Sequence, residues 1–203
     1  MEGKAALIVI EGLDGSGKTT QAKLLVRALR KTRNAVFTAE PSKGEIGRFI
    51  RKRILYGEKR VPTAVEALLF AADRIDHVRN EVAPMLAEGK TVVCDRYLYS
   101  SLAYQGSAGL SIDWIQTINQ HAQRPDLALF IDVNPETMLK RLTRRKSVME
   151  NLETQKKVRE IYLHFVTNGE LTKVDGEKDK AEVAQGILKI VSEFLKTRVN
   201  SRR

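Results

Sequence analysis

A glycine-rich segment near the amino terminus has the residue types and spacing of a phosphate-binding site. Residues 12–19 match the pattern G-x-x-x-x-G-K-[ST]. An apolar run at residues 5–11 precedes the segment, and a helix-compatible stretch follows it. Glycines at this spacing let backbone N–H groups turn toward a phosphate, and the positive end of the next helix strengthens their field. We therefore predict a phosphate-binding loop made of Gly12, Leu13, Asp14, Gly15, Ser16, Gly17, Lys18, Thr19 and Thr20.

Two side chains of this loop have separate expected roles. Lys18 is expected to reach the terminal phosphates of a bound nucleotide, and the Thr19 hydroxyl to ligate Mg²⁺. A chance glycine-rich turn is the alternative. The strand expected before the loop and the helix expected after it argue against that alternative.

A second polar group, Asp95-Arg96-Tyr97, follows the apolar run at residues 91–94. A carboxylate at a strand end beside a phosphate loop can hold the hydration shell of Mg²⁺, and an adjacent arginine can bind a second phosphate through two parallel hydrogen bonds. A strand-end salt bridge of Asp95 is the alternative. The nearby phosphate loop favours the functional interpretation. Cys94 is expected to be a small core residue.

The helix expected over residues 63–88 has an apolar stripe on one side and a different pair of residues on the other. We assign the stripe to the core: Val65, Leu68, Leu69, Ala72 and Ile75, with Asp76 at its edge. On the opposite side, Phe70 lies one turn from Arg74, where the two could stack on a planar ring and bond its edge. From periodicity alone, packing of Phe70 under a neighbouring helix is the stronger alternative.

Strand and helix patterns alternate along the chain. We expect strands at residues 5–11, 35–39, 91–95, 127–133 and 171–175, and helices near 17–33, 44–56, 63–88, 112–122, 134–145, 150–167 and 178–197. Continuous apolar runs are typical of strands buried on both faces of a parallel sheet. The pattern predicts one α/β domain spanning residues 1–203, with a five-stranded parallel sheet between two layers of helices. In such a sheet, ligands bind beyond the carboxyl ends of the strands.

Composition and charge exclude several classes of protein. The fractions of hydrophobic and charged residues, 42% and 30%, argue against disorder and low complexity. One cysteine, with no histidine at a ligand-like spacing, argues against a disulfide framework or structural zinc. The longest apolar stretch has six residues, far below the ~20 of a membrane span. We therefore expect a soluble, cytoplasmic protein without a membrane partner.

The net charge of +10 requires an acidic partner, which the total alone does not identify as nucleic acid, membrane or phosphorylated ligand. Basic residues gather at 48–60, 140–146 and 196–203. The first two clusters lie in periodic segments and are candidates for a phosphate-facing surface. The third is expected to be a solvated tail.

Four segments together resemble the thymidylate kinase family of P-loop nucleoside monophosphate kinases. They are residues 11–20 (EGLDGSGKTT), 68–74 (LLFAADR), 95–97 (DRY) and 100–106 (SSLAYQG). The phosphate loop alone is shared by many nucleotide-binding proteins, but its combination with the other segments is far more specific. The resemblance covers essentially the whole chain. It implies a three-layer P-loop NTPase fold, phosphorylation of dTMP to dTDP for dTTP synthesis, ATP as donor, Mg²⁺ as cofactor and a homodimer.

The resemblance also implies how the two nucleotides are held. ATP would lie on residues 15–20, with its adenine near residues 174–176. The phosphate of dTMP would be held by Arg96, with Arg51 beside it in the basic segment that follows Glu40-Pro41.

For the rest of dTMP, the resemblance implies contacts to the base and to the sugar. Phe70 would stack on the base, Arg74 would bond O4, and Ser101 or Gln105 would approach the N3 edge. Asp14 resembles the carboxylate that bonds the 3′-hydroxyl, and Tyr104 would crowd the 2′ position.

One branch of the family has an arginine where this chain has Gly15. In the other branch the transition-state arginine comes from a lid, and residues 139–152 lie where that lid belongs. The resemblance therefore implies that Arg141, Arg144 or Arg145 acts with Lys18 and Arg96 on the transferred phosphoryl group. A solvated basic helix end is the alternative for some of these charges.

Other functions share the phosphate loop. A deoxynucleoside kinase would phosphorylate a bare 5′-hydroxyl and would need a general base near it, and another pyrimidine nucleoside monophosphate kinase is closer still. A nucleic-acid-dependent ATPase would bind DNA with a salt-sensitive affinity. No basic stretch interleaved with aromatic residues supports that last class, so nucleic acid is not an expected partner.

Overall fold

The computed structural model describes residues 4–57, 61–141 and 151–200. Within these ranges, five strands form one parallel sheet in the order β2-β3-β1-β4-β5. Their bounds are β1 (Ala6–Gly12), β2 (Ala35–Ala39), β3 (Thr91–Asp95), β4 (Leu127–Asp132) and β5 (Thr172–Asp175). The predicted five-stranded parallel sheet is confirmed, with each strand within one residue of its expected ends.

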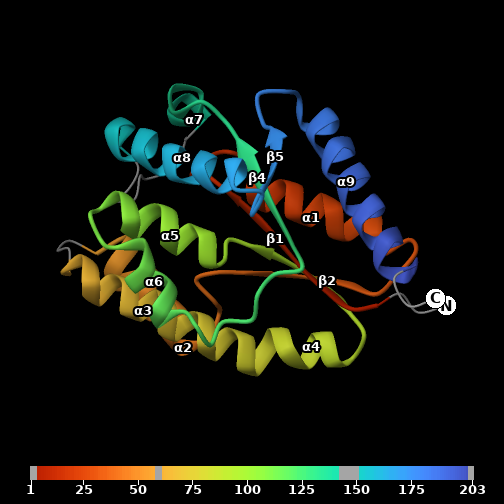
Figure 1. Cartoon of the computed structure of the whole chain (residues 1–203), viewed down its shortest axis with the longest axis horizontal. Helices are drawn as coiled ribbons and strands as arrows, with labels where there is room; N and C mark the ends of the chain where they lie inside the picture. The colour runs from red at the N-terminus through yellow and green to blue at the C-terminus, as the bar shows by residue number, and fades with distance from the viewer. Residues whose placement is uncertain (1–3, 58–60, 142–150, 201–203) are drawn as a thin grey trace.

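Two layers of helices cover the sheet (Figure 1). One layer contains α1 (Lys18–Leu29) and α9 (Lys180–Asn200), and the other contains α4 (Ala83–Ala87), α5 (Leu98–Ser107) and α8 (Leu152–Thr167). The remaining described helices are α2 (Glu45–Phe49), α3 (Thr63–His77), α6 (Ile112–Ile118), α7 (Pro135–Arg141) and the π-helical segments η1 (Ile50–Leu55) and η2 (Val78–Val82). Within the described ranges, no helix has both the length and the apolar composition to cross a membrane.

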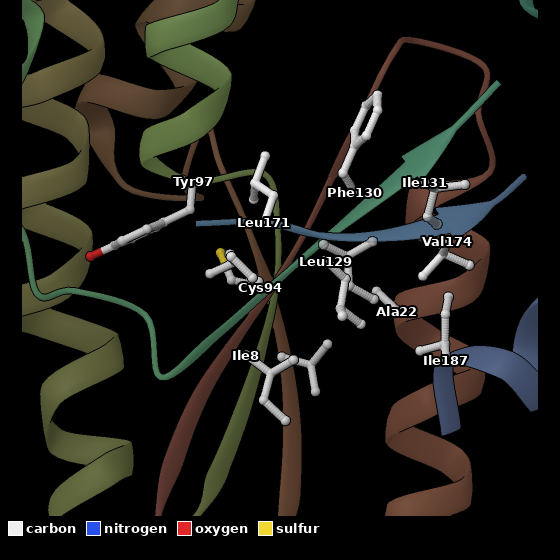
Figure 2. Close-up of a cluster of buried hydrophobic side chains, with 14 of the residues drawn as sticks. Ile8, Ala22, Cys94, Tyr97, Leu129, Phe130, Ile131, Leu171, Val174 and Ile187 are labelled. Carbon is white, nitrogen blue, oxygen red and sulfur yellow. The ribbon is translucent and has the colours of Figure 1, made fainter. Parts of the chain in front are cut away.

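The hydrophobic core lies between the sheet and its two helical layers. Every residue of β1 and β3 is buried, which explains why their sequences are continuous apolar runs. Figure 2 shows Ile8, Cys94 and Leu129 from three neighbouring strands together with Ile187 of α9. Cys94 is buried, as predicted. Full burial of a side chain such as Ile8 stabilises the fold by about 1.5–3 kcal/mol, so the core fixes the strand ends that carry the polar residues.

Helix α3 contradicts the predicted core stripe. Val65, Leu68 and Ile75 are 43%, 49% and 38% exposed. The buried residues of α3 are mostly polar: Glu66, Ala67, Ala71, Asp73, Arg74 and His77. The physical reason is that the buried face of α3 packs against polar groups at the carboxyl end of the sheet. Hydrogen bonds to those groups offset the cost of removing the polar side chains of α3 from water. Periodicity identified two faces but could not indicate which one faces the protein.

Candidate active site

The loop between β1 and α1 has the backbone that a phosphate-binding loop requires. Gly12, Gly15 and Gly17 have φ angles of 151°, 77° and 89°. A Cβ on Gly12 would lie 2.8 Å from both the Ile131 carbonyl oxygen and Ser16 Oγ, so only glycine fits there. Ser16 Oγ is buried and has no hydrogen-bond partner among the described residues. The loop is therefore tightly packed at Gly12, and its Ser16 hydroxyl is available to donate a hydrogen bond to an anion.

Lys18, the first residue of α1, is buried inside this loop. Its Nζ donates a hydrogen bond of 2.5 Å to the Leu13 carbonyl oxygen. Burial, together with the charge of Arg96, lowers the pKa of Lys18 to about 8. A phosphate placed beside the ammonium would favour its charged form. The loop therefore holds a desolvated cation that an anionic ligand can stabilise.

Thr19 and Asp95 bring oxygen atoms from two elements together. The Thr19 hydroxyl donates to Asp95 Oδ2 at the end of β3. Asp95 Oδ1 is buried and has no hydrogen-bond partner in the part of the chain that the structure describes. An orphaned carboxylate oxygen beside a hydroxyl suits Mg²⁺, which prefers oxygen ligands and keeps several waters. Among the described residues no group of three His, Cys, Asp or Glu side chains could hold a metal, so such an ion would also need phosphate and water ligands.

Arg96 directly follows β3 and is held by hydrogen bonds to three side chains. Its Nη2 donates to Asp14 Oδ1 at 2.6 Å and to the Tyr104 hydroxyl at 3.2 Å, and its Nη1 donates to Ser100 Oγ at 3.0 Å. Burial opposes ionisation of Asp14, but the charges of Arg96 and Lys18 outweigh it and lower the Asp14 pKa. Arg96 also has a φ of 67°, which is uncommon for a residue other than glycine and is often found at functional sites.

Two cavities meet at the phosphate loop. The smaller, about 300 Å³, is lined by Glu40 and by side chains of the site described above: Asp14, Lys18, Thr19, Asp95 and Arg96. The larger, about 500 Å³, lies between Gln21, Arg141, residues 176–180 and Val183. Both include Gly15, Gly17 and Thr20. The arrangement can hold two ligands whose phosphates approach each other over one loop.

Comparisons with known proteins agree with this geometry. A family model described as "Thymidylate kinase" matches residues 10–187. The chain belongs to the thymidylate kinase family. It is 43% identical to a "Probable thymidylate kinase" of Pyrococcus abyssi over 197 residues, which cover 93% of this chain and 96% of that protein. It is 40% identical to a "Probable thymidylate kinase" of Pyrobaculum calidifontis over 186 residues, covering 91% and 94% of the two chains.

Within this thymidylate kinase fold, Arg74 of α3 is the centre of a buried polar network. It is 1% exposed and donates to Glu40 Oε2 at 2.9 Å and to Asn119 Oδ1 at 2.5 Å. Its Nη2 donates to the Tyr97 carbonyl oxygen and to Ser101 Oγ, both at 3.1 Å. The structure thus brings Arg74 and Ser101 together.

Two other residues predicted to contact the base flank this network. Phe70 lies one turn before Arg74 on α3 and is partly buried. Gln105 of α5 donates to Glu66 Oε1 at 2.8 Å, and its Oε1 is buried without a hydrogen-bond partner among the described residues. An amide oxygen in that state can accept a hydrogen bond from a ligand.

The predicted basic residues differ in their position relative to the two cavities. Arg51 of η1 donates through Nη1 to the carbonyl oxygens of Pro41 and Ser42 at 2.7 and 2.8 Å, and it is not among the described residues that line the smaller cavity. Arg141 donates to the Gly176 carbonyl oxygen at 3.1 Å and lines the larger cavity. Arg144 and Arg145 lie outside the described residues, as do residues 142–150 of the predicted lid.

Sequence reasoning missed several polar residues that shape the site. Glu11, fully buried at the end of β1, accepts hydrogen bonds from Tyr97 N, Ser100 Oγ and the Tyr162 hydroxyl. An acidic residue that ends an apolar strand was the signal for it. Asp73 of α3 is also buried and accepts hydrogen bonds from Ser42. An acidic residue on a buried helix face would have indicated it, but the sequence pattern did not show which face of α3 is buried.

Proposed function

We propose that this protein transfers the γ-phosphoryl group of ATP to dTMP and forms dTDP, as a step in dTTP synthesis. One observation carries the proposal: one phosphate loop lines two cavities, which share Gly15, Gly17 and Thr20, and Lys18 and Arg96 both line the smaller one. A kinase for a nucleoside monophosphate must bring two phosphorylated ligands end to end. An enzyme that consumes ATP and dTMP is expected in the cytoplasm.

The larger cavity suits ATP. Its adenine would lie near residues 174–176, beside Arg141, and its phosphates would lie on residues 15–20. Lys18 would bind the β- and γ-phosphates. Thr19 and Asp95 would hold Mg²⁺, directly or through its waters, because the buried Asp95 Oδ1 has no hydrogen-bond partner among the described residues. When bound, Mg²⁺ would neutralise charge on the phosphates.

The smaller cavity and the network behind it suit dTMP. Arg96 would bind the acceptor phosphate with the two ends of its guanidinium, and Arg51 of η1, which bonds the turn after β2, would lie nearby. Asp14 would accept a hydrogen bond from the 3′-hydroxyl. The Tyr104 hydroxyl donates to Asp14 at 3.1 Å, which supports their joint role at the sugar and the exclusion of a 2′-hydroxyl.

For the base, we assign stacking to Phe70, recognition of O4 to Arg74 and recognition of the N3 edge to Ser101 or Gln105. Within the part of the chain that the structure describes, four hydrogen bonds hold the Arg74 guanidinium, which has five N–H donors. It is therefore fixed in place, and its described partners leave one donor for a ligand. A fixed donor forms a hydrogen bond with a base that presents an acceptor at that position. A base without such an acceptor leaves the buried donor unpaired and binds more weakly.

Catalysis requires no covalent nucleophile. The phosphoryl group passes in line through a loose transition state whose charge spreads over its oxygen atoms. Lys18 and Arg96 line the same cavity and would stabilise this charge, Lys18 from the donor side and Arg96 from the acceptor side. Both are held by protein atoms before substrate binds, so little reorganisation is needed during transfer.

A substrate panel tests the proposed function. ADP release from ATP would be measured with nucleosides, nucleoside monophosphates and single-stranded DNA, each with Mg²⁺ and with a chelator. We expect release with dTMP in Mg²⁺ and none after chelation. Stimulation by DNA alone would indicate an ATPase, and stimulation by thymidine but not by dTMP would indicate a deoxynucleoside kinase. Either result would contradict the proposal.

We further propose that residues 1–203 act as one kinase domain of the branch with a catalytic arginine in the lid, here residues 139–152. Two observations support this branch. The loop carries Gly15 instead of an arginine, and Arg141 reaches the donor cavity from α7. Of the three candidates, Arg141 donates to the Gly176 carbonyl oxygen near the expected adenine, so its described position favours a role in ATP binding.

Single alanine variants of Arg141, Arg144 and Arg145 test the lid assignment. We expect one of the three to lower kcat by about 10³-fold, as loss of a transition-state arginine does. If Arg141 instead contacts the adenine, Arg141→Ala raises the KM for ATP and lowers kcat by much less than about 10³-fold. Lys140→Ala, next to Arg141 on α7, is the control. The lid assignment is wrong if all three arginine variants keep wild-type kcat.

We also propose a homodimer that forms through the outer face of α3. Val65, Leu68 and Ile75 expose apolar surface there, and Phe49 of the neighbouring α2 is 49% exposed. Contiguous apolar surface of this kind is typical of an interface between protein chains.

Leu68→Glu is expected to convert the dimer to a monomer at micromolar concentration, because the substitution buries a carboxylate in an apolar interface. Sedimentation or light scattering would measure the mass. Thr197→Glu, on the exposed surface of α9 in the other layer, serves as control and should leave the mass unchanged. A wild-type protein that is monomeric at these concentrations would contradict the proposal.

A further inference from the structure

The turn that follows β2 is held by one buried carboxylate. Ser42 donates to Asp73 twice, from its backbone N–H at 2.7 Å and from its hydroxyl at 2.6 Å, so that each carboxylate oxygen of Asp73 accepts one bond. Asp73 and Ser42 are 1% and 2% exposed. Two charge-assisted hydrogen bonds from one residue fix both the position and the rotation of that residue.

The opposite side of the same turn is bound by Arg51. Its Nη1 donates to the carbonyl oxygens of Pro41 and Ser42. Ser42 is therefore held from α3 through its N–H and hydroxyl and from η1 through its carbonyl group. A Cβ on Gly47 would lie 2.0 Å from the Ser42 carbonyl oxygen, which shows how closely α2 packs on the turn. The direction of the Arg51 guanidinium thus depends on where Asp73 places Ser42.

The residue at the start of the turn lines the acceptor cavity. Glu40 accepts a hydrogen bond of 2.9 Å from Arg74, and its Oε1 lies 3.1 Å from His77 Nδ1. The backbone N–H of Glu40 donates to the Asp95 carbonyl oxygen at 3.0 Å. Asp73 therefore holds Ser42, and Arg74 and His77 hold Glu40, all from one face of α3. Of the residues in this turn, Glu40 lines the cavity that contains Arg96.

The chemistry of Asp73 is unusual for a purely structural residue. Among the residues that the structure describes, no lysine, arginine or histidine forms an ion pair with it. A buried carboxylate without a cation costs desolvation free energy that a neutral side chain would avoid. The Asp73 carboxylate accepts two hydrogen bonds from Ser42, and these hold the turn after β2 in one geometry beside the proposed acceptor-phosphate subsite.

We propose that Asp73 is a positioning residue for the acceptor-phosphate subsite: through Ser42 it sets the wall formed by Glu40 and the orientation of Arg51. This inference rests on the proposed function, because it takes dTMP as the ligand of the smaller cavity. ATP lies on the other side of the phosphate loop, so its binding should not depend on Asp73. The prediction is selective weakening of dTMP binding.

Calorimetric titration and steady-state kinetics of the full chain test this inference. For Asp73→Ala we expect the Kd and KM for dTMP to rise by about 10-fold or more, because a misplacement of about 1 Å is costly in such sites. Asp73→Asn and Ser42→Ala each keep part of the pairing and should raise both values by roughly 3-fold. The Kd for ATP should stay within about 2-fold in all three variants.

Asp113→Asn is the matched control. Asp113 is an exposed aspartate of α6, outside the turn that Asp73 holds and outside the residues lining the smaller cavity, so its variant should keep the wild-type Kd for dTMP. Asp73→Asn and Ser42→Ala retain most of the side-chain volume. If Asp73→Ala does not fold, these two variants test the inference through the same dTMP-binding measurements.

Two results would overturn the inference. Asp73 and Ser42 variants with a lower melting temperature but unchanged Kd for dTMP would leave Asp73 a structural residue. An equal loss of ATP and dTMP binding would show a general distortion of the site. Wild-type protein that neither binds nor phosphorylates dTMP would instead contradict the proposed function itself, and the inference with it.

Discussion

Replacement of Arg96 by lysine is expected to lower kcat/KM for dTMP by about 10²-fold or more, while KM for ATP stays within about 2-fold. Lysine keeps the positive charge and loses the planar fork of donors. In the structure the two Nη atoms of Arg96 point to different partners, Ser100 and Asp14, and an acceptor phosphate would need both. One ammonium group cannot make both contacts in that geometry.

The matched control is Arg33→Lys. Arg33 donates through Nη1 to Thr91 Oγ1 at the amino end of β3, whereas Arg96 follows the carboxyl end of the same strand. Steady-state kinetics with each substrate varied in turn would measure the effect, and thermal unfolding would show whether loss of the Asp14 pairing destabilises the protein. Unchanged kcat/KM for dTMP in Arg96→Lys would contradict the placement of the acceptor phosphate.

The sheet could be predicted from the sequence because buried parallel strands are apolar on both faces. Residues 6–10, 91–94 and 127–131 have that pattern and lie in β1, β3 and β4. Helix α5 was not predicted, because residues 98–107 mix polar and apolar side chains without a clear stripe. Its buried side includes Ser101 and Gln105, which have polar partners, so apolar periodicity could not reveal it.

The donor side of the site was easier to predict than the acceptor side. Lys18 and Thr19 lie in a contiguous motif whose spacing indicates its geometry, and in the structure they line one cavity with Asp95. The acceptor side is assembled from side chains distant in the chain, such as Glu40, Asp73 and Asn119. Their contacts depend on the orientation of α3, and the apolar stripe of that helix indicated the wrong face.

Replacement of Lys18 by methionine is expected to separate activity from stability. We expect kcat to fall by about 10³-fold or more, because the variant loses the positive charge that we propose binds the β- and γ-phosphates. The ligand-free variant should nevertheless unfold at a temperature no lower than wild type. Lys23→Met, five residues further along α1, is the control, since the exposed Lys23 contributes at most a weak cation–π contact with Phe37.

The stability half of this prediction follows from the pKa of Lys18. Burial and Arg96 lower that pKa to about 8, so the folded protein binds this proton less tightly than the unfolded chain does. The charged form therefore destabilises the ligand-free fold at pH 7, by roughly 3 kcal/mol. The penalty fades as the pH rises from about 8 toward the ordinary lysine pKa, and methionine removes it at every pH. Loss of the bond to the Leu13 carbonyl costs about 1 kcal/mol, which is less. A melting temperature several degrees below wild type would contradict this account of Lys18, and an unchanged kcat would exclude it from the site.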